Sequence, residues 1–296
     1  MNNKLFIIGN GFDLAHGLPT RFDPDFKEIA EKNEPDSSFW DLYQSEVADI
    51  WSDFENLLAK PNFNTLSDIF SAYYPDYYSD RESDRDGIIL QADMSGNLQN
   101  SLDEFACQAE DALWDIEPKR EFIEMFGEDD LFINFNYTHT LERVYGIEKE
   151  RVLHVHGEVG ANNLILGYPE GTYSPESIEI DVLQKGRGPY REVKLEDYLD
   201  SIEDYYISTA YHHLVDKIEG FQKVPNISAV NSFLDTRKIH EVIVYGHSCA
   251  IDFPYFDYLN QQYPFAKWLF YAFDDVTRWN IENMVSDIRI GDYEII

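Results

Sequence analysis

An apolar run near the start of the chain, ending directly in a glycine-containing turn, constrains the fold more than any other feature. Residues 5–8 are all apolar, and Gly9-Asn10-Gly11 follow at once. Such a run is typical of a buried parallel strand, and glycines after it let backbone N–H groups approach a pyrophosphate at a helix N-terminus. The dinucleotide-binding pattern is incomplete, because Leu14 stands at its third glycine position. A tight strand-to-helix turn without a ligand explains the same residues.

Further short apolar runs predict additional strands. They cover residues 131–133, 152–155, 164–166, 242–245 and 268–272, with edge strands at 288–290 and 293–296. Helical spacing of apolar residues predicts helices within 37–60, 98–126 and 195–221, a short helix over 140–145, and a polar loop over 75–96. We therefore expect an α/β fold with a Rossmann-like, mostly parallel, doubly wound sheet interrupted by helical insertions.

This pattern assigns the chain to one nucleotide-binding domain, residues 1–296. The sheet falls in segments 1–25, 127–170 and 236–296, and the helical insertions are 26–126 and 171–235.

Charge and composition narrow the function classes. The formal net charge of −33 repels phosphate backbones, so nucleic acid is disfavoured as a partner. Two cysteines, Cys107 and Cys249, cannot form a four-thiolate zinc site or a disulfide framework. No apolar run reaches the ~20 residues of a membrane span, and no secretory signal is evident, so we expect a cytoplasmic protein. The basic stretch from Lys185 to Lys194 fits an anion-binding loop, although an ordinary surface loop is favoured.

Four predicted strands end in small or polar clusters. These are Gly9-Asn10-Gly11, Asn134-Phe-Asn136, His156-Gly157 and Gly246-His-Ser248. Ligands of open parallel sheets bind beyond the carboxyl ends of the strands, so we expect these clusters to share one crevice.

Each cluster also has a structural interpretation. Asn136 has the donors and acceptors to orient a ribose or a water, but it or Thr138 could cap the following helix. His156, at a strand end, suits a general base, whereas His154 within the strand is more often a core residue. The two histidines have no third ligand at a recognisable spacing, so no metal ligand is predicted.

The remaining polar residues are ambiguous in the same way. Ser248 suits a phosphate contact or a helix cap, and Asp13 a ribose hydroxyl or a cap. Asp252 is explained by charge complementarity in a first helical turn. Asp53 and Glu55, two residues apart, do not share a helix face, so a solvated surface is favoured over an acid/base pair.

Five blocks, in order along the chain, resemble the AbiH family of bacterial phage abortive-infection proteins. They are Gly9-Asn-Gly-Phe-Asp-Leu-Ala-His-Gly-Leu-Pro-Thr20, Trp51-Ser-Asp-Phe-Glu55, Asn134-Phe-Asn-Tyr-Thr-His-Thr-Leu-Glu142, His154-Val-His-Gly157 and Tyr245-Gly-His-Ser248. The resemblance implies a role in phage defence, with a phage-derived or host protein as trigger.

The same blocks are more distantly similar to the NAD site of sirtuin-type proteins. This similarity implies catalytic roles for Asn136 and His156. It implies nucleotide contacts at Gly9, Asn10, Gly11, Asp13, Gly17, Thr20, Gly246 and Ser248. Thr138 replaces an aspartate of the sirtuin pattern, which weakens the expected ribose contact, and the paired CxxC zinc ribbon is absent, which disfavours protein deacylation.

Three functions follow as hypotheses. The first is hydrolysis of NAD or a related nucleotide, which would be a substrate rather than a prosthetic group. The second is a nucleotide-binding sensor without catalysis. The third is a nuclease or metal-dependent phosphohydrolase using Asp53, Glu55 and His154. The composition is compatible with a monomer or an oligomer.

Overall fold

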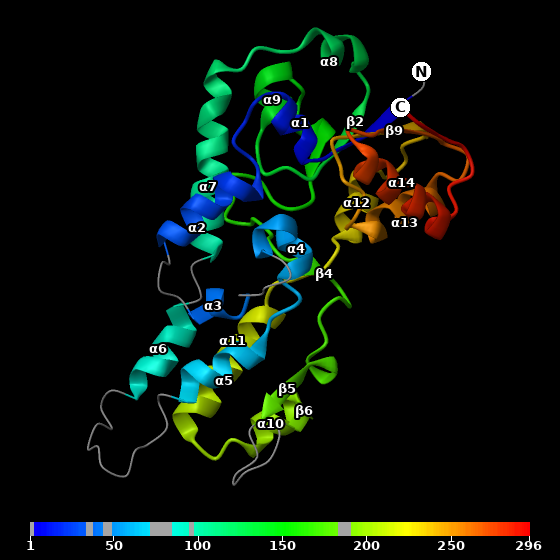
Figure 1. Ribbon diagram of the computed structural model, residues 1–296. Helices are drawn as coiled ribbons and strands as arrows, with labels where there is room; N and C mark the ends of the chain where they lie inside the picture. Colours follow the sequence, from blue (N-terminus) through cyan, green and yellow to red (C-terminus); the bar gives the residue numbers. More distant parts are fainter. Residues whose placement is uncertain (1–2, 34–37, 44–48, 72–84, 95–97, 183–190) are drawn as a thin grey trace. The chain divides into compact units, whose positions relative to one another are not determined.

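The computed structural model describes residues 3–33, 38–43, 49–71, 85–94, 98–182 and 191–296 (Figure 1). The chain divides into two compact units, each described here by itself. Unit 1 comprises Met1–Arg21, Leu102–Ile165 and Val224–Ile296, and unit 2 comprises Phe22–Ser101 and Leu166–Lys223. Residues 102–126, assigned to an insertion from the sequence, thus group with unit 1. That the chain forms one nucleotide-binding domain stays a prediction.

Unit 1 is built on a six-stranded sheet with the order β10-β9-β8-β1-β2-β3. The strands are β1 (Asn3–Ile8), β2 (Leu131–Asn134), β3 (Val152–His154), β8 (Ile239–Tyr245), β9 (Lys267–Tyr271) and β10 (Tyr293–Ile295). Each neighbouring pair runs parallel. The chain starts in the middle, adds β2 and β3 on one side, and returns to add β8 to β10 on the other. This is the Rossmann strand order, and it confirms the predicted fold class.

Helices cover both faces of this sheet (Figure 1). Unit 1 contains α1 (Asn10–Ala15), α8 (Arg120–Met125), α9 (Thr140–Tyr145), α12 (Ile227–Phe233), α13 (Phe253–Gln262) and α14 (Asp275–Ile288), most of α7 (Leu98–Ala112), and the 3-10 turns η4 (Leu113–Asp115) and η5 (Lys149–Arg151). Leu5 and Ile7 pack with α12, α13 and α14, while Phe6 and Ile8 pack with α1, α8 and α9. Because successive residues of a strand point to opposite faces, the all-apolar run is the pattern of a strand buried on both sides.

Unit 2 is mainly helical. Its helices are η1 (Phe22–Phe26), α2 (Lys27–Asn33), α3 (Ser38–Asp41), η2 (Ile50–Asp53), α4 (Phe54–Leu57), α5 (Phe63–Ser71), α6 (Asp86–Met94), η6 (Pro175–Ser177), α10 (Leu195–Ser201) and α11 (Tyr205–Glu219). Two small sheets complete it: β4 (Tyr168–Pro169) with β7 (Gln222–Lys223), and β5 (Glu179–Val182) with β6 (Arg191–Lys194). Tyr211 of α11 is fully buried, with Phe63 and Phe70 of α5 and Tyr198 of α10 against its ring.

Several predicted elements are wrong in detail. Residues 164–166 form no strand, because the Ile165 N–H turns back to the His156 carbonyl. The expected strand at 288–290 is a helix end, where Arg289 is left-handed and the Ile290 N–H bonds to the Val285 carbonyl.

The long helices are interrupted, and the predicted 75–96 loop contains α6. Ile88 and Ala92, one helical turn apart, are buried within that acidic stretch. Residues 75–84 and 95–96 of that loop, and residues 185–190 of the basic stretch, lie outside the described residues.

Candidate functional site

The carboxyl ends of four strands of unit 1 meet at one sheet edge. Ile8 is level with Asn134 and Tyr245 in neighbouring strands, and Asn134 is level with His154. Residues that follow these strand ends also touch: Asn136 Nδ2 donates to the Gly9 carbonyl at 3.2 Å. The strand ends therefore converge as expected, and they include the point between β1 and β8 where the strand order reverses. That the clusters share one crevice stays a prediction.

Glycines let the loops after β1 and β8 pack backbone against backbone. A Cβ on Gly9 or Gly11 would lie 2.6 Å from the backbone around Gly246. The Gly9 and Gly11 N–H groups donate to the carbonyls of Tyr245 and Gly246, at 3.0 and 2.7 Å. Close packing accounts for these glycines without a ligand. Their predicted phosphate contact stays a prediction.

Asn10, Gly17 and Thr20 form the rest of the first loop. Asn10 is exposed, and its side-chain amide donates to the Thr20 carbonyl at 2.6 Å. Gly17 follows α1 with φ of +78°, the left-handed conformation that commonly ends a helix. Thr20 Oγ1 is buried, and among the described residues it has no hydrogen-bond partner.

The connection between β2 and α9 is held by buried side chains. Asn134 Oδ1 accepts from the Asn136 N–H at 3.0 Å, and the Asn136 amide reaches Gly9. Neither Asn136 nor Thr138 caps α9, because residue His139 precedes the helix and the Thr138 hydroxyl is turned elsewhere.

The buried carboxylate of Asp13, in α1, accepts two hydrogen bonds from the segment that joins β2 to α9. Thr138 Oγ1 donates to its Oδ2 at 2.5 Å, and Thr140 Oγ1 donates to its Oδ1 at 2.7 Å. Burial raises the pKa of Asp13 from an ordinary 3.8 to about 6, although both threonine hydrogen bonds oppose the rise. The sequence did not indicate this contact, since the partners lie 125 and 127 residues away.

Asp13 should make stability depend on pH. The pKa of Asp13 is raised on folding. The contribution of Asp13 to the free energy of unfolding is therefore fully present below pH 3.8 and is lost as the pH rises through about 6. Between pH 5 and pH 7 we expect the free energy of unfolding to fall by about 1 kcal/mol more in the wild type than in Asp13→Asn. Urea denaturation of both proteins in EDTA measures this difference. Parallel pH profiles would contradict the buried, raised carboxyl.

His156 is oriented by a carboxylate that the sequence analysis did not assign to it. His156 Nε2 lies 3.2 Å from Asp252 Oδ1, and His247 Nε2 lies 3.5 Å from Asp252 Oδ2. The Phe135 ring packs edge-on against both imidazoles. Asp252 has a left-handed backbone with φ of +67°, an uncommon conformation often found at functional sites. Ser248 is exposed, and its Oγ accepts from the Ala250 N–H at 3.4 Å.

His154 is the last residue of β3, which ends before His156, and it belongs to a different cluster. Its Nε2 lies 3.0 Å from Glu142 Oε1, and its Nδ1 lies 3.0 Å from the Asn136 carbonyl. His139 lies nearby with Glu110 and Glu158, at 2.8 and 3.1 Å. The hydrogen bond to Glu110 raises the pKa of His139 against the effect of burial. Burial opposes ionisation of Glu110, but the bonds from His139 outweigh it and lower the pKa of Glu110.

Asp53 and Glu55 both belong to unit 2 and have separate environments. Asp53 is exposed and accepts from Asn56 Nδ2. Glu55 forms an ion pair with Lys223, whose side chain is buried. The solvated surface expected for Glu55 is therefore wrong.

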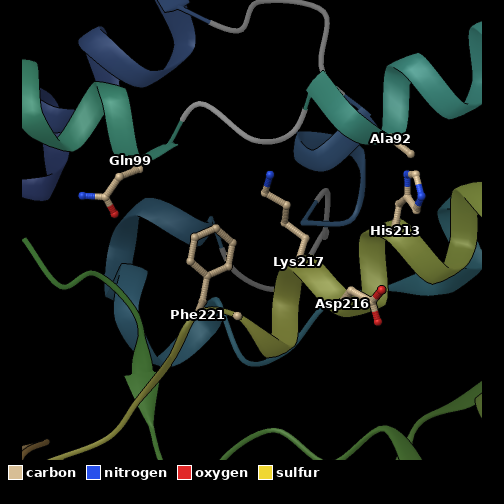
Figure 2. Close-up of a pocket in the computed structure, with 7 residues that line it drawn as sticks. Ala92, Gln99, His213, Asp216, Lys217 and Phe221 are labelled. Carbon is tan, nitrogen blue, oxygen red and sulfur yellow. The ribbon is translucent and has the colours of Figure 1, made fainter.

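An open pocket lies in unit 2 (Figure 2). It is lined by Ala92, Gln99, His213, Asp216, Lys217, Gly220 and Phe221. Its two charged side chains, Asp216 and Lys217, have opposite signs and come from one helix. None of the residues predicted from the sequence lines it, so it gives no support to a nucleotide site at that place.

Across the described part of the chain, no helix combines the length and apolarity that a membrane span needs.

Comparison with known proteins identifies the family. No curated protein and no solved structure matches the chain. The family described as "Bacteriophage abortive infection AbiH" matches residues 5–272, which is most of the chain. The match extends over the β1 loop, the β2–α9 connection, the end of β3 and the β8 loop. The chain belongs to the AbiH family of bacteriophage abortive-infection proteins.

Proposed function

We propose that this abortive-infection protein binds NAD or a related nucleotide at the carboxyl edge of the unit 1 sheet and hydrolyses it. The observation that carries the proposal is the convergence of the β1, β2, β3 and β8 ends at the reversal of a Rossmann strand order. Ligands of doubly wound sheets bind at this place. The substrate class is taken from the resemblance of the sequence blocks to sirtuin-type NAD sites, which no match to a known protein supports.

His156 would act as the general base. With its Nε2 turned to Asp252, its Nδ1 is the atom that accepts a proton, and the carboxylate stabilises the resulting imidazolium. Water would add to the anomeric carbon as the bond to nicotinamide breaks. Nicotinamide leaves as a neutral base, and His156 takes the proton released by the water.

Asn136 would orient the water or the ribose. Its side chain already donates to the Gly9 carbonyl, so it would present its amide oxygen to the ligand. The site works in the cytoplasm in this proposal, and a phage-derived or host protein serves as the trigger.

A sensor without catalysis is the second candidate. The observation that favours it is that Asn136 and the Gly9 and Gly11 amides are bonded within the protein. Groups that are already hydrogen-bonded within the protein can stabilise the fold without taking part in a reaction.

Incubation with NAD and chromatography of the products test the proposal. We expect nicotinamide and ADP-ribose from the wild type, and a loss of at least about 100-fold in rate for His156→Ala and for Asn136→Ala. His240→Ala, at an exposed histidine of β8, should match the wild type.

The outcomes separate the two candidates. Full turnover in both site variants would remove the proposed mechanism. No turnover, combined with a higher melting temperature in NAD or ADP-ribose, would favour the sensor. Neither turnover nor stabilisation would reject the nucleotide site.

A further inference from the structure

Two imidazoles and two carboxylates of unit 1 gather beside the β2–α9 connection. His139 ends that connection, Glu142 lies in α9, His154 ends β3 and Glu158 follows β3. The ligand atoms of His139, His154 and Glu158 all lie within 4.8 Å of one another. Glu142 Oε1 lies 3.0 Å from His154 Nε2.

The Nδ1 atoms of both imidazoles have hydrogen-bond acceptors outside this group. His139 Nδ1 lies 2.8 Å from Glu110 Oε1, and His154 Nδ1 lies 3.0 Å from the Asn136 carbonyl. Each Nδ1 therefore carries a proton, so in the neutral form of each imidazole Nε2 holds the lone pair. Histidines that bind metals are fixed in this way, by a carboxylate or a backbone carbonyl on the other nitrogen.

Both Nε2 atoms face carboxylates. His139 Nε2 lies 3.1 Å from Glu158 Oε2, and His154 Nε2 lies 3.0 Å from Glu142 Oε1. A lone pair facing a carboxylate oxygen is unfavourable unless a proton or a metal ion lies between the two atoms. Among the described residues, Glu142 Oε2 is also buried with no hydrogen-bond partner, and such an oxygen is costly unless a ligand satisfies it.

We propose that His139 Nε2, His154 Nε2, Glu142 and Glu158 bind one divalent transition-metal ion of the zinc type. Imidazole nitrogens and carboxylate oxygens are ligands of Zn²⁺. At metal–ligand distances of about 2.0–2.1 Å, tetrahedral ligands lie about 3.3 Å apart. The two Nε2-to-oxygen distances, 3.1 and 3.0 Å, are close to this separation, whereas the full set of His139, His154 and Glu158 ligand atoms, which lie within 4.8 Å of one another, would draw together around the ion.

Four protein ligands make this a closed, structural site. The ion would tie the end of β3 to the connection that carries Asn136, whose carbonyl bonds to His154. Glu110 would orient His139 by accepting a hydrogen bond from its Nδ1. Arg143 Nε lies 3.0 Å from the same Glu110 oxygen and fixes that carboxylate in turn. The metal proposal does not rest on nucleotide hydrolysis, since the ion contacts none of the proposed reacting atoms.

Metal analysis of the tag-free protein tests the proposal. After chelation and removal of the chelator, we expect about one Zn²⁺ to bind per chain in calorimetry and to raise the melting temperature. Co²⁺ in its place should give the strong visible absorption of tetrahedral coordination. A wild-type protein that takes up no stoichiometric Zn²⁺ or Co²⁺ would overturn the proposal, leaving an imidazolium–carboxylate cluster.

Variants locate the ion. His139→Ala and His154→Ala should abolish stoichiometric binding, whereas His240→Ala, at an exposed histidine, should bind as the wild type does. Glu110→Gln, which acts through His139, should weaken binding about 10- to 100-fold. Should the histidine variants fail to fold, Glu158→Gln in the loop after β3 provides the same test. Unchanged affinity in the ligand variants would place the ion elsewhere and reject the site.

Discussion

Gly246→Ala should be among the most destabilising single-methyl additions in unit 1. Gly246 has φ of +70°, and a Cβ there would lie 2.4 Å from the Phe12 nitrogen and 2.7 Å from the Gly11 carbonyl carbon. The left-handed conformation costs about 1–2 kcal/mol for an alanine, and forcing an atom into packed backbone adds about 1–3 kcal/mol. We expect a loss of about 2–5 kcal/mol in the free energy of unfolding, measured by urea denaturation without ligand.

Gly17→Ala is the matched control. Gly17 also has a left-handed backbone, with φ of +78°, but nothing lies within 4 Å of its added Cβ. Only the conformational cost of about 1–2 kcal/mol should appear. The difference between the variants isolates the contact between the β1 and β8 loops. Equal losses would show that this contact contributes nothing, and would return Gly246 to its predicted role beside a phosphate.

The sheet could be predicted because its evidence is local in the sequence. The run from Leu5 to Ile8 is apolar on both strand faces, and Gly9 marks its end. Once β1, β2, β3 and β8 were identified, the rule for parallel sheets placed Asn136 and His156 at one edge. Short apolar runs without a sheet partner misled the prediction. Residues 164–166 have the composition of a strand, but the Ile165 N–H bonds to His156 instead.

The polar partners of the site could not be predicted, because they depend on long-range pairing. Asp13 bonds to Thr138 and Thr140 across the β1 and β2 ends, and His156 meets Asp252, which lies 96 residues further along the chain. No periodicity links such residues. In the sequence, Asp252 also has the position of an ordinary acidic residue in the first turn of a helix. A search for acidic residues near the predicted strand ends would have listed it without showing its partner.

The same limit applies to the proposed metal ligands, which no spacing in the sequence indicates. His154 and His156 are two residues apart, but β3 ends at His154, and the structure gives the two histidines different partners, Glu142 and Asp252. The companion of His154 is His139, which enters from another strand end. Ligand sets that come from separate connections leave no fixed spacing in the sequence, unlike those of a zinc ribbon.

Glu55→Gln should destabilise unit 2 more than an ordinary surface substitution. Lys223 is 6% exposed and pairs with Glu55, so removing the carboxylate leaves a buried ammonium without its counter-charge. Breaking a buried pair in this way costs about 3–5 kcal/mol. Partial exposure of Glu55 lets water reach one side of the pair, so we expect a loss near the lower figure, about 3 kcal/mol. Urea denaturation measures it.

Two further variants test whether the loss in Glu55→Gln comes from the unpaired ammonium of Lys223. Asp53→Asn changes the neighbouring exposed carboxylate and should shift the free energy of unfolding by less than about 0.5 kcal/mol. Glu55→Gln combined with Lys223→Met removes the stranded charge, so it should recover most of the loss. If the double variant is as unstable as Glu55→Gln alone, the loss comes from packing around α4 rather than from an unpaired ammonium, and the ion pair adds no measurable stability.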